Sequence, residues 1–304
     1  MALKPIFEII FQAMGKNMKK LFIFLGYILF AVTAGTAIAC TGTICTAQAK
    51  NLRIAVSIAP EIAFVQEVVG DRADILCVIP EGGSPASYSP SPKALLQLRQ
   101  ADVYFTIGVA SEGLNIAGRL PENIRIVPLH EEAAKVYPDL MLGTSRDPHI
   151  WLSPKRVMVM VRKIAEEAAA LDPENKAEYE KNAQKYKEKL QAVDEEIRQI
   201  FAQTPQKIFL SFHPAFGYLA DEYGLTMYAL EKHGKEAGAK YLQECINIAK
   251  KNRVKAIFYQ KEISSRQVEA FAREIGGKAV LLNPLAKNYG ENMLIMAKTM
   301  QENM

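Results

Sequence analysis

One long amphipathic segment, residues 173–203, most constrains what this chain can fold into. Apolar side chains recur in it every three or four residues with Lys and Glu between them, which predicts a single helix of about 30 residues, or ~45 Å. Asp172 and Pro173 supply a helix cap and a first-turn proline. The repeat lasts only about four heptads and is flanked by segments of a different pattern, so we expect a helix that packs across two lobes and not a coiled coil.

Short β-like runs alternate with helical patterns on both sides of this segment. The runs are 53–57, 75–79, 103–107 and 124–128 before it, and 207–212, 226–230, 256–259 and 279–282 after it. This alternation predicts parallel sheets covered by helices on both faces. We therefore expect an α/β fold with two parallel-sheet lobes, residues 50–171 and 205–304, joined by one long helix at 172–204.

The first 49 residues have the features of an export leader. Met18 and two lysines precede an apolar run, residues 21–39, that contains no charged side chain. Two processing sites are possible. Cys40 ends a lipobox-like sequence and would carry a lipid, whereas Ala47-Gln48-Ala49 fits a simple cleavage site. An uncleaved membrane anchor is the third alternative, since 19 apolar residues are just long enough to span a bilayer. All three place the rest of the chain outside the cytoplasm.

The charge of the chain argues against nucleic acid as a partner. The formal net charge is +4, and four lysines against one glutamate in residues 1–39 account for +3 of it, so the remainder carries about +1. A nucleic-acid-binding protein would concentrate Lys and Arg on one face. The same balance disfavours membrane binding through basic patches, so any membrane attachment is expected at the N-terminal lipid or signal anchor alone.

Neither cysteine chemistry nor an enzyme motif is evident. The four cysteines match no zinc knuckle and no CxxC motif, and we expect Cys77 and Cys245 to be buried free thiols. HExxH, GxSxG, Walker A and GxGxxG motifs are all missing. The sequence therefore favours a protein that holds a ligand over an enzyme.

Two of the four histidines lie in proline-containing loops at corresponding places of opposite lobes. His149 ends an Asp-Pro-His sequence, and His213 lies in Phe-His-Pro. In open parallel sheets, ligands bind beyond the carboxyl ends of the strands. Imidazole is a common ligand of zinc and similar ions, so we expect both side chains to bind a metal ion. His130 and His233 are expected at the surface.

From about residue 52 onward, the chain resembles the ZnuA/TroA-like solute-binding proteins of ABC transporters. The matching segments, in order, are 57–60, 78–85 with 88–90, 147–154, 211–216, 234–236 and 283–285. The resemblance implies two α/β lobes, one long rigid helix and a metal site in the cleft between the lobes. It also implies Zn²⁺ or Mn²⁺ as the transported ligand, a membrane permease as partner, and a location in the periplasm or on the outer face of the cytoplasmic membrane. We expect a monomer.

The resemblance places His149 and His213 on ligand positions of the family. Ala86, however, stands where the family usually has a histidine after Ser-Pro, and its methyl group cannot coordinate a metal ion. Two imidazoles without a nearby carboxylate leave the metal charge poorly compensated. We therefore expect weaker or altered metal binding, with zinc ahead of manganese because both matched ligands are nitrogen donors.

Three further residues are candidate ligands on weaker grounds. Asn283 stands where the family usually has aspartate, and Gln260 stands where it often has glutamate. Their amide oxygens are weaker donors for zinc than carboxylate or imidazole. Glu61 or a water molecule could complete the shell.

Other functions compete with the metal receptor, which we favour. A degenerate relative could bind another small solute or a metal chelate in the same crevice, using Tyr88 and Asn283. A surface adhesin or structural lipoprotein is the second alternative. An enzyme is the most distant.

Overall fold

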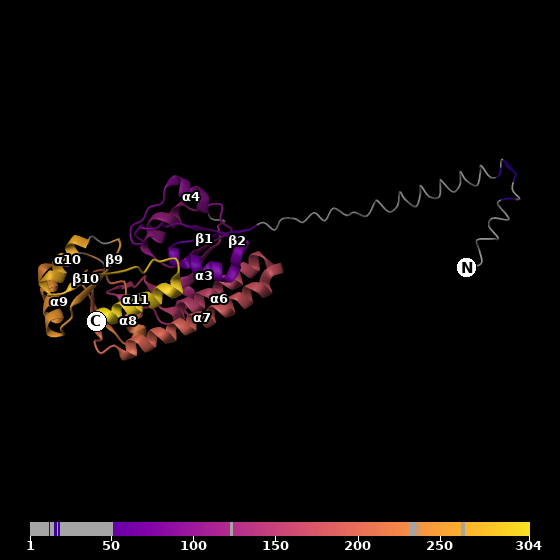
Figure 1. Ribbon diagram of the computed structural model, residues 1–304. Helices are drawn as coiled ribbons and strands as arrows, with labels where there is room; N and C mark the ends of the chain where they lie inside the picture. Colours follow the sequence, from indigo (N-terminus) through magenta and orange to yellow (C-terminus); the bar gives the residue numbers. More distant parts are fainter. Residues whose placement is uncertain are drawn as a thin grey trace. The chain divides into compact units, whose positions relative to one another are not determined.

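The computed structural model describes residues 51–304, apart from 122–123, 232–234, 236 and 263–264, together with Gln12, Gly15, Lys16 and Met18. The expected leader, including Cys40, therefore lies almost wholly outside the described residues. The chain divides into two units, Met1–Lys50 and Asn51–Met304, and the second contains every sheet described below (Figure 1).

The N-terminal half of this second unit is built on a parallel sheet with the strand order β2-β1-β3-β4. The strands are β1 (Leu52–Val56), β2 (Ala73–Cys77), β3 (Val103–Thr106) and β4 (Ile126–Pro128), and each overlaps a predicted run. β1 pairs with both β2 and β3, so the order of the strands across the sheet reverses between β1 and β3. Ligands of open α/β sheets bind at such a point.

The C-terminal half repeats this design with the strand order β10-β9-β7-β8. The strands are β7 (Ile208–Ser211), β8 (Thr226–Ala229), β9 (Ala256–Gln260) and β10 (Lys278–Leu282), all parallel and all within or next to predicted runs. A short antiparallel hairpin of β5 (Met141–Leu142) and β6 (Ser145–Arg146) belongs to the first half and was not predicted.

Helices connect the strands and cover the sheets. They are α3 (Ala59–Val69), α4 (Pro92–Leu98), α5 (Leu129–Ala134), α6 (Pro154–Leu171), α7 (Lys176–Gln203), α8 (Gly217–Tyr223), α9 (Ala239–Lys251), α10 (Ser265–Glu274) and α11 (Tyr289–Asn303). Two of them begin on the same local signal. Ser91 and Ser153 each accept a hydrogen bond from a first-turn backbone N–H, and a proline follows each serine.

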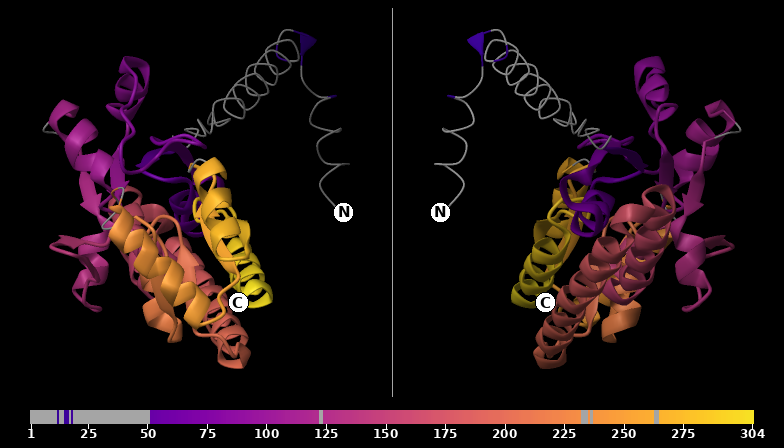
Figure 2. Two further views of the ribbon diagram at one scale, coloured as in Figure 1. Left: turned by 90° about the vertical axis from the view of Figure 1, so that its left-hand side faces the viewer. Right: turned by 90° about the vertical axis from the view of Figure 1, so that its right-hand side faces the viewer.

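The predicted long helix is present, although it begins three residues later than expected. Pro173–Asn175 form a 3₁₀ turn, and α7 then runs for 28 residues. Asn182 of α7 donates to the Val68 carbonyl on α3, whereas Asp194 of α7 accepts from the Tyr223 hydroxyl on α8. α7 therefore packs against both halves, beside α6 and α11 (Figure 2).

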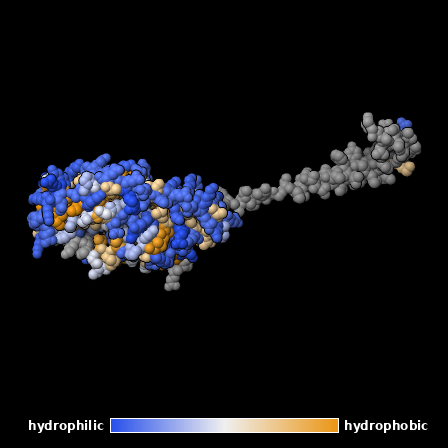
Figure 3. All heavy atoms as spheres, turned by 90° about the horizontal axis from the view of Figure 1, so that it is seen from below, coloured by the Kyte–Doolittle hydropathy of each residue, from blue (hydrophilic) through white to orange (hydrophobic). Residues whose placement is uncertain are grey.

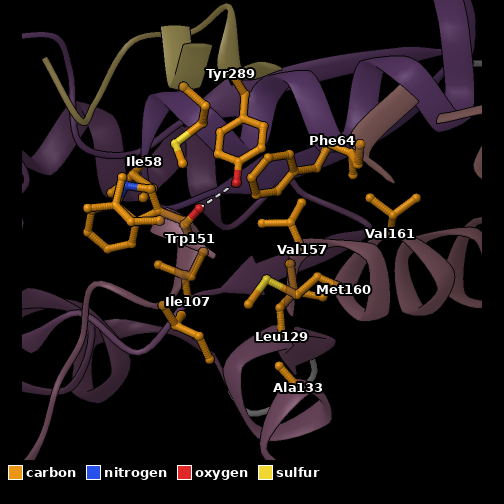
Figure 4. Packing of buried hydrophobic residues seen from close by; sticks show 14 of the residues in the cluster. Ile58, Phe64, Ile107, Leu129, Ala133, Trp151, Val157, Met160, Val161 and Tyr289 are labelled. Atoms are coloured by element: carbon orange, nitrogen blue, oxygen red, sulfur yellow. Dashed lines mark hydrogen bonds between the residues drawn. The ribbon is translucent and has the colours of Figure 1, made fainter. Parts of the chain in front are cut away.

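One hydrophobic core is shared by the two halves. Tyr289 at the start of α11 donates from its hydroxyl to the Trp151 carbonyl at 2.7 Å, and its ring meets the edge of Phe64 with centroids 4.9 Å apart (Figure 4). The indole Nε1 of Trp151 in turn donates to the Pro284 carbonyl at 2.9 Å. The halves share this core, so the core does not mark where one lobe ends and the other begins. The lobe boundaries expected at 171/172 and 204/205 therefore remain a prediction.

Adjacent residues on a strand point to opposite faces of each sheet. Val56 and Phe209 enter the shared core, whereas their neighbours Ala55 and Leu210 enter separate clusters beneath α4 and α9. Each sheet is thus buried on both faces, as the alternation of strands and helices predicts.

The surface is mainly hydrophilic, and the hydrophobic residues on the face in Figure 3 lie in small scattered groups. Leu114 and Leu96 are the most exposed large apolar side chains of the described residues, at 76% and 60%. Within the part of the chain that the structure describes, we find no helix with the length and apolarity needed to cross a bilayer.

Candidate metal centre

Two histidine side chains, one from each half, face each other across the cleft. His149 follows β6 and precedes the 3₁₀ turn Ile150–Leu152, while His213 lies two residues beyond β7. Their ring centroids are 5.2 Å apart, and the ring planes meet at 78°. The structure therefore brings together the two loops that the sequence singled out, while their role as metal ligands remains a prediction.

His149 is held by the carboxylate of Asp147. Oδ1 of Asp147 lies 2.7 Å from the imidazole Nδ1 and also accepts the backbone N–H of His149 at 2.9 Å. Burial lowers the pKa of His149, against the opposing effect of the Asp147 carboxylate, and so favours the neutral imidazole that can bind a metal ion. With Nδ1 engaged, Nε2 is the nitrogen that remains for a ligand.

His213 is held in the same manner by Glu231. Oε2 of Glu231 lies 2.6 Å from the His213 Nδ1 atom, and both side chains are about one-fifth exposed. The Ser211 hydroxyl donates to the His213 carbonyl at 2.6 Å and fixes the loop that carries the ring. The two halves therefore each contribute one imidazole backed by one carboxylate.

The expectation that no carboxylate lies near the imidazoles is wrong. Asp147 contacts Nδ1 of His149, and Glu231 contacts Nδ1 of His213. Both carboxylates add negative charge there and fix the orientation of the ring. Two sequence signals could have found them. Asp147 lies only two residues before His149, and Glu231 lies two residues beyond β8, at the carboxyl end of a strand next to β7.

A cavity of about 810 Å³ surrounds the two histidines. Both halves line it, with residues that include Ser84, Ala86, Gly108, Arg146, Trp151, Glu231, Gln260 and Leu285. Gln260, the last residue of β9, is 8% exposed, and its Nε2 atom is buried without a hydrogen-bond partner. Gln260 thus reaches the site that the sequence predicted for it, in contrast to the remaining two candidates.

The structure does not bring Asn283 or Glu61 into this cavity. Asn283 lines a neighbouring hollow, where its Oδ1 accepts the backbone N–H of Leu285 at 3.2 Å. Glu61 is fully buried in the first turn of α3, where its Oε2 accepts the backbone N–H groups of Ser57 and Ile58. Glu61 therefore caps the N-terminus of α3 and does not point toward the two histidines as a ligand would.

Other sequence predictions about metal-binding side chains have mixed outcomes. Cys77 and Cys245 are free thiols, as expected, but only Cys245 is buried, whereas Cys77 is half-buried. His130 is half-buried, not at the surface, because it packs on the loop around Gly108. His233 lies outside the described residues. Among the residues that are described, no three His, Cys, Asp or Glu side chains are grouped to hold a metal ion.

Comparison with known proteins identifies relatives along almost the whole second unit. Residues 54–303 match the ZnuA family, described as zinc-uptake complex component A, periplasmic. The chain is 30% identical over 254 residues to the high-affinity zinc uptake system protein ZnuA of Bacillus subtilis, a match that covers 78% of this chain and 80% of that protein.

Two further matches agree with this family. The zinc-binding lipoprotein AdcA of Streptococcus pneumoniae is 31% identical over 256 residues, which cover 77% of this chain but only 50% of AdcA. A crystal structure of ZnuA superposes with a TM-score of 0.77 at 32% identity, over 83% of this chain and 99% of that one. The expected fold of two parallel-sheet lobes and a long helix is thereby confirmed. The chain belongs to the ZnuA family of zinc-uptake solute-binding proteins.

Proposed function

We propose that this chain captures one divalent transition metal ion, zinc in preference to manganese, between His149 and His213 and delivers it to an ABC importer. The observation that carries the proposal is that each imidazole has its Nδ1 atom engaged by a carboxylate. This arrangement leaves both Nε2 atoms for a metal ion. Zinc is preferred because it binds imidazole nitrogen well, whereas manganese prefers oxygen ligands.

The surrounding charges support capture of a cation. Binding to two imidazoles brings the positive charge of the ion into a partly buried cleft, which is costly unless negative charge lies nearby. Asp147 and Glu231 supply that charge from behind the rings. Gln260 lines the same cavity, whereas Asn283 and Glu61 contribute through their loop and helix contacts and not as ligands.

The fold supports a receptor that holds its cargo between two halves. One nitrogen comes from each half, so a bound ion connects them. Trp151 lies next to this connection, with its ring centroid 5.4 Å from that of His149 and its indole bonded to Pro284 in the other half. The shared core and α7 oppose large movements of the halves, which favours release through small shifts around the cleft.

Membership of the ZnuA family supports a location and a partner for this chain, and both are part of the proposal. ZnuA-family proteins are extracytoplasmic binding proteins and not enzymes, and the relative AdcA is a lipoprotein. We place this chain in the periplasm or on the outer face of the cytoplasmic membrane, with Cys40 as the site of lipid attachment. Its partner is a membrane permease, and the receptor acts as a monomer.

Calorimetric titration of the metal-free full-length chain with Zn²⁺ tests this function. We expect one zinc ion per chain for the wild type and no binding for the His149→Ala/His213→Ala variant. His130→Gln is the matched control, because His130 is a half-buried histidine outside the lining of the cavity. Absence of zinc binding by the wild type, or its persistence in the double variant, would contradict the proposal.

A further inference from the structure

The cavity around His149 and His213 is far larger than a single metal ion requires. Zinc sits about 2 Å from a ligating nitrogen, whereas the cavity measures about 810 Å³. That volume falls within the range of roughly 300–1,000 Å³ that is typical of small-molecule pockets. Ala86 lies in the wall, where its methyl group neither fills the space nor coordinates. The remaining volume suits a second, organic component.

Two imidazoles also leave a zinc ion with open coordination positions. Zinc in proteins commonly takes four donors. In the described ranges no third His, Cys, Asp or Glu joins the two histidines in a metal-holding group. Oxygen atoms of a small chelator would complete the shell and occupy the cavity at the same time.

Gln260 supplies a hydrogen-bond donor for such a chelator. Its side chain is buried in the cavity wall, and its Nε2 atom has no partner. An amide N–H group cannot bind a cation, but it donates readily to a carboxylate oxygen. Leaving this donor buried and unpaired is unfavourable, so its position points to an acceptor on a ligand.

Two charged residues in the cavity wall could also contact a chelator. Lys235 lines the cavity and forms no ion pair with the residues that the structure describes, so its ammonium group is available to a carboxylate. Glu262 also lines the cavity, and its Oε2 atom is buried without a partner. A carboxylate oxygen accepts hydrogen bonds and would suit a ligand hydroxyl. The three side chains together match a ligand that carries both carboxylates and a hydroxyl.

We propose that this cavity binds zinc together with a small hydroxycarboxylate chelator. His149 and His213 hold the metal ion, while Gln260, Lys235 and Glu262 hold the chelator. This inference rests on the proposed function, because it requires the same two imidazoles. It changes the cargo from a bare ion to a metal chelate.

Equilibrium dialysis of the metal-free full-length chain with labelled zinc and labelled citrate tests the inference. We expect one citrate per chain to be retained when zinc is present and none when it is absent. Tricarballylate, which has the same carboxylates without the hydroxyl, should be retained at least about 10-fold more weakly. One zinc per chain without citrate overturns the inference and leaves the proposed function intact. Retention of neither zinc nor citrate contradicts both.

Gln260→Leu separates a contact with the chelator from a contact with the metal. We expect citrate retention to weaken about 10-fold, and by clearly more than the affinity for zinc alone. Gln243→Leu, on the exposed face of α9, is the matched control and should change neither value. If Gln260→Leu weakens binding of zinc alone to the same extent, the amide binds the metal directly and the inference is wrong.

Ala86→His tests whether the chelator uses the space beside Ala86 and an open coordination position of the zinc ion. A third imidazole should raise the affinity for zinc alone at least about 10-fold and lower citrate retention, because it takes both the coordination position and the space. Ala86→Leu fills the space without a donor, so it should lower citrate retention without a gain in zinc affinity. Unchanged citrate retention in Ala86→His would overturn the inference.

Discussion

A β-carbon built on Gly217 would lie 2.5 Å from Oδ2 of Asp147. Only glycine therefore allows the start of α8 to approach this carboxylate so closely. The other oxygen of the same carboxylate holds both the backbone N–H and the Nδ1 atom of His149. Gly217 thus sets the position of His149, a candidate metal ligand, without lining the cavity itself.

Gly217→Ala should lower zinc affinity even though it changes no candidate ligand. The added methyl group must displace the Asp147 carboxylate, which releases His149 from its orientation. We expect a loss of about 10-fold in calorimetric zinc affinity, the low end of the range for disturbed outer-shell partners. Gly118→Ala is the control, because a β-carbon there meets nothing within 4 Å. Equal affinities for the two variants would contradict this role of Gly217.

Asp147→Asn and Glu231→Gln should weaken zinc binding while the fold is retained. Each amide keeps the size of the carboxylate but removes the charge that orients and polarises the imidazole in front of it. We expect each substitution to cost about 10- to 100-fold in affinity. Asp221→Asn, on the exposed side of α8, provides a matched loss of charge away from the cavity. Affinities within the error of that control would show that the two carboxylates do not act on the site.

Glu61→Gln should change the pH dependence of stability. Burial, with a smaller contribution from the charge of Glu112, raises the pKa of Glu61 well above its ordinary value of 4.5. The folded protein therefore retains a proton that the unfolded chain releases, so this group loses stabilising effect as the pH rises above 4.5. The amide of the Glu61→Gln variant would still offer an oxygen to the N–H groups that Glu61 caps, but without a titratable charge.

Urea unfolding at about pH 5 and about pH 8 checks this prediction. The free energy of unfolding of Glu61→Gln, relative to the wild type, should rise between the two pH values. Glu188→Gln, on the exposed face of α7, should show no comparable rise. A constant difference between Glu61→Gln and the wild type would mean that Glu61 does not titrate in this range.

Arg156→Met should destabilise the protein strongly. Arg156 of α6 is 3% exposed and donates to Oε1 of Glu222 on α8 at 2.9 Å and to the Pro138 carbonyl at 2.9 Å. Its removal leaves the buried Glu222 carboxylate with only Lys155 as a cationic partner among the described residues. We expect a loss of about 3 kcal/mol in the free energy of unfolding.

Arg162→Met is the control for this substitution. Arg162 lies on the same helix, but its ion pair with Glu166 is about half exposed and should contribute only about 0.5 kcal/mol. Denaturant unfolding measures both variants. Similar losses for the two would show that burial does not distinguish the two ion pairs.

The architecture was predictable because its signals are local. Periodicity in α7 and the eight β-like runs depend on residues close in sequence, and the structure contains an element at each of them. The hairpin of β5 and β6 was missed because two-residue strands have no periodicity to detect. Its one signal was Gly143, whose φ of 67° suits the first position of a tight hairpin turn.

The site was only partly predictable because its geometry depends on contacts between distant residues. His149 and His213 were found from their loops, but the pairing of His213 with Glu231 joins the ends of two different strands. Glu61 and Asn283 illustrate the opposite error. Both are polar residues near strand ends, yet their side chains satisfy backbone N–H groups in their own segments.

The central claim is that a single zinc ion binds one imidazole from each half of the protein. X-ray absorption at the zinc edge of the one-to-one complex tests it most directly. The account predicts two imidazole nitrogens at about 2.0–2.1 Å, and one in each of the single variants His149→Ala and His213→Ala. Zinc without imidazole scattering, or a spectrum unchanged in both variants, would contradict it.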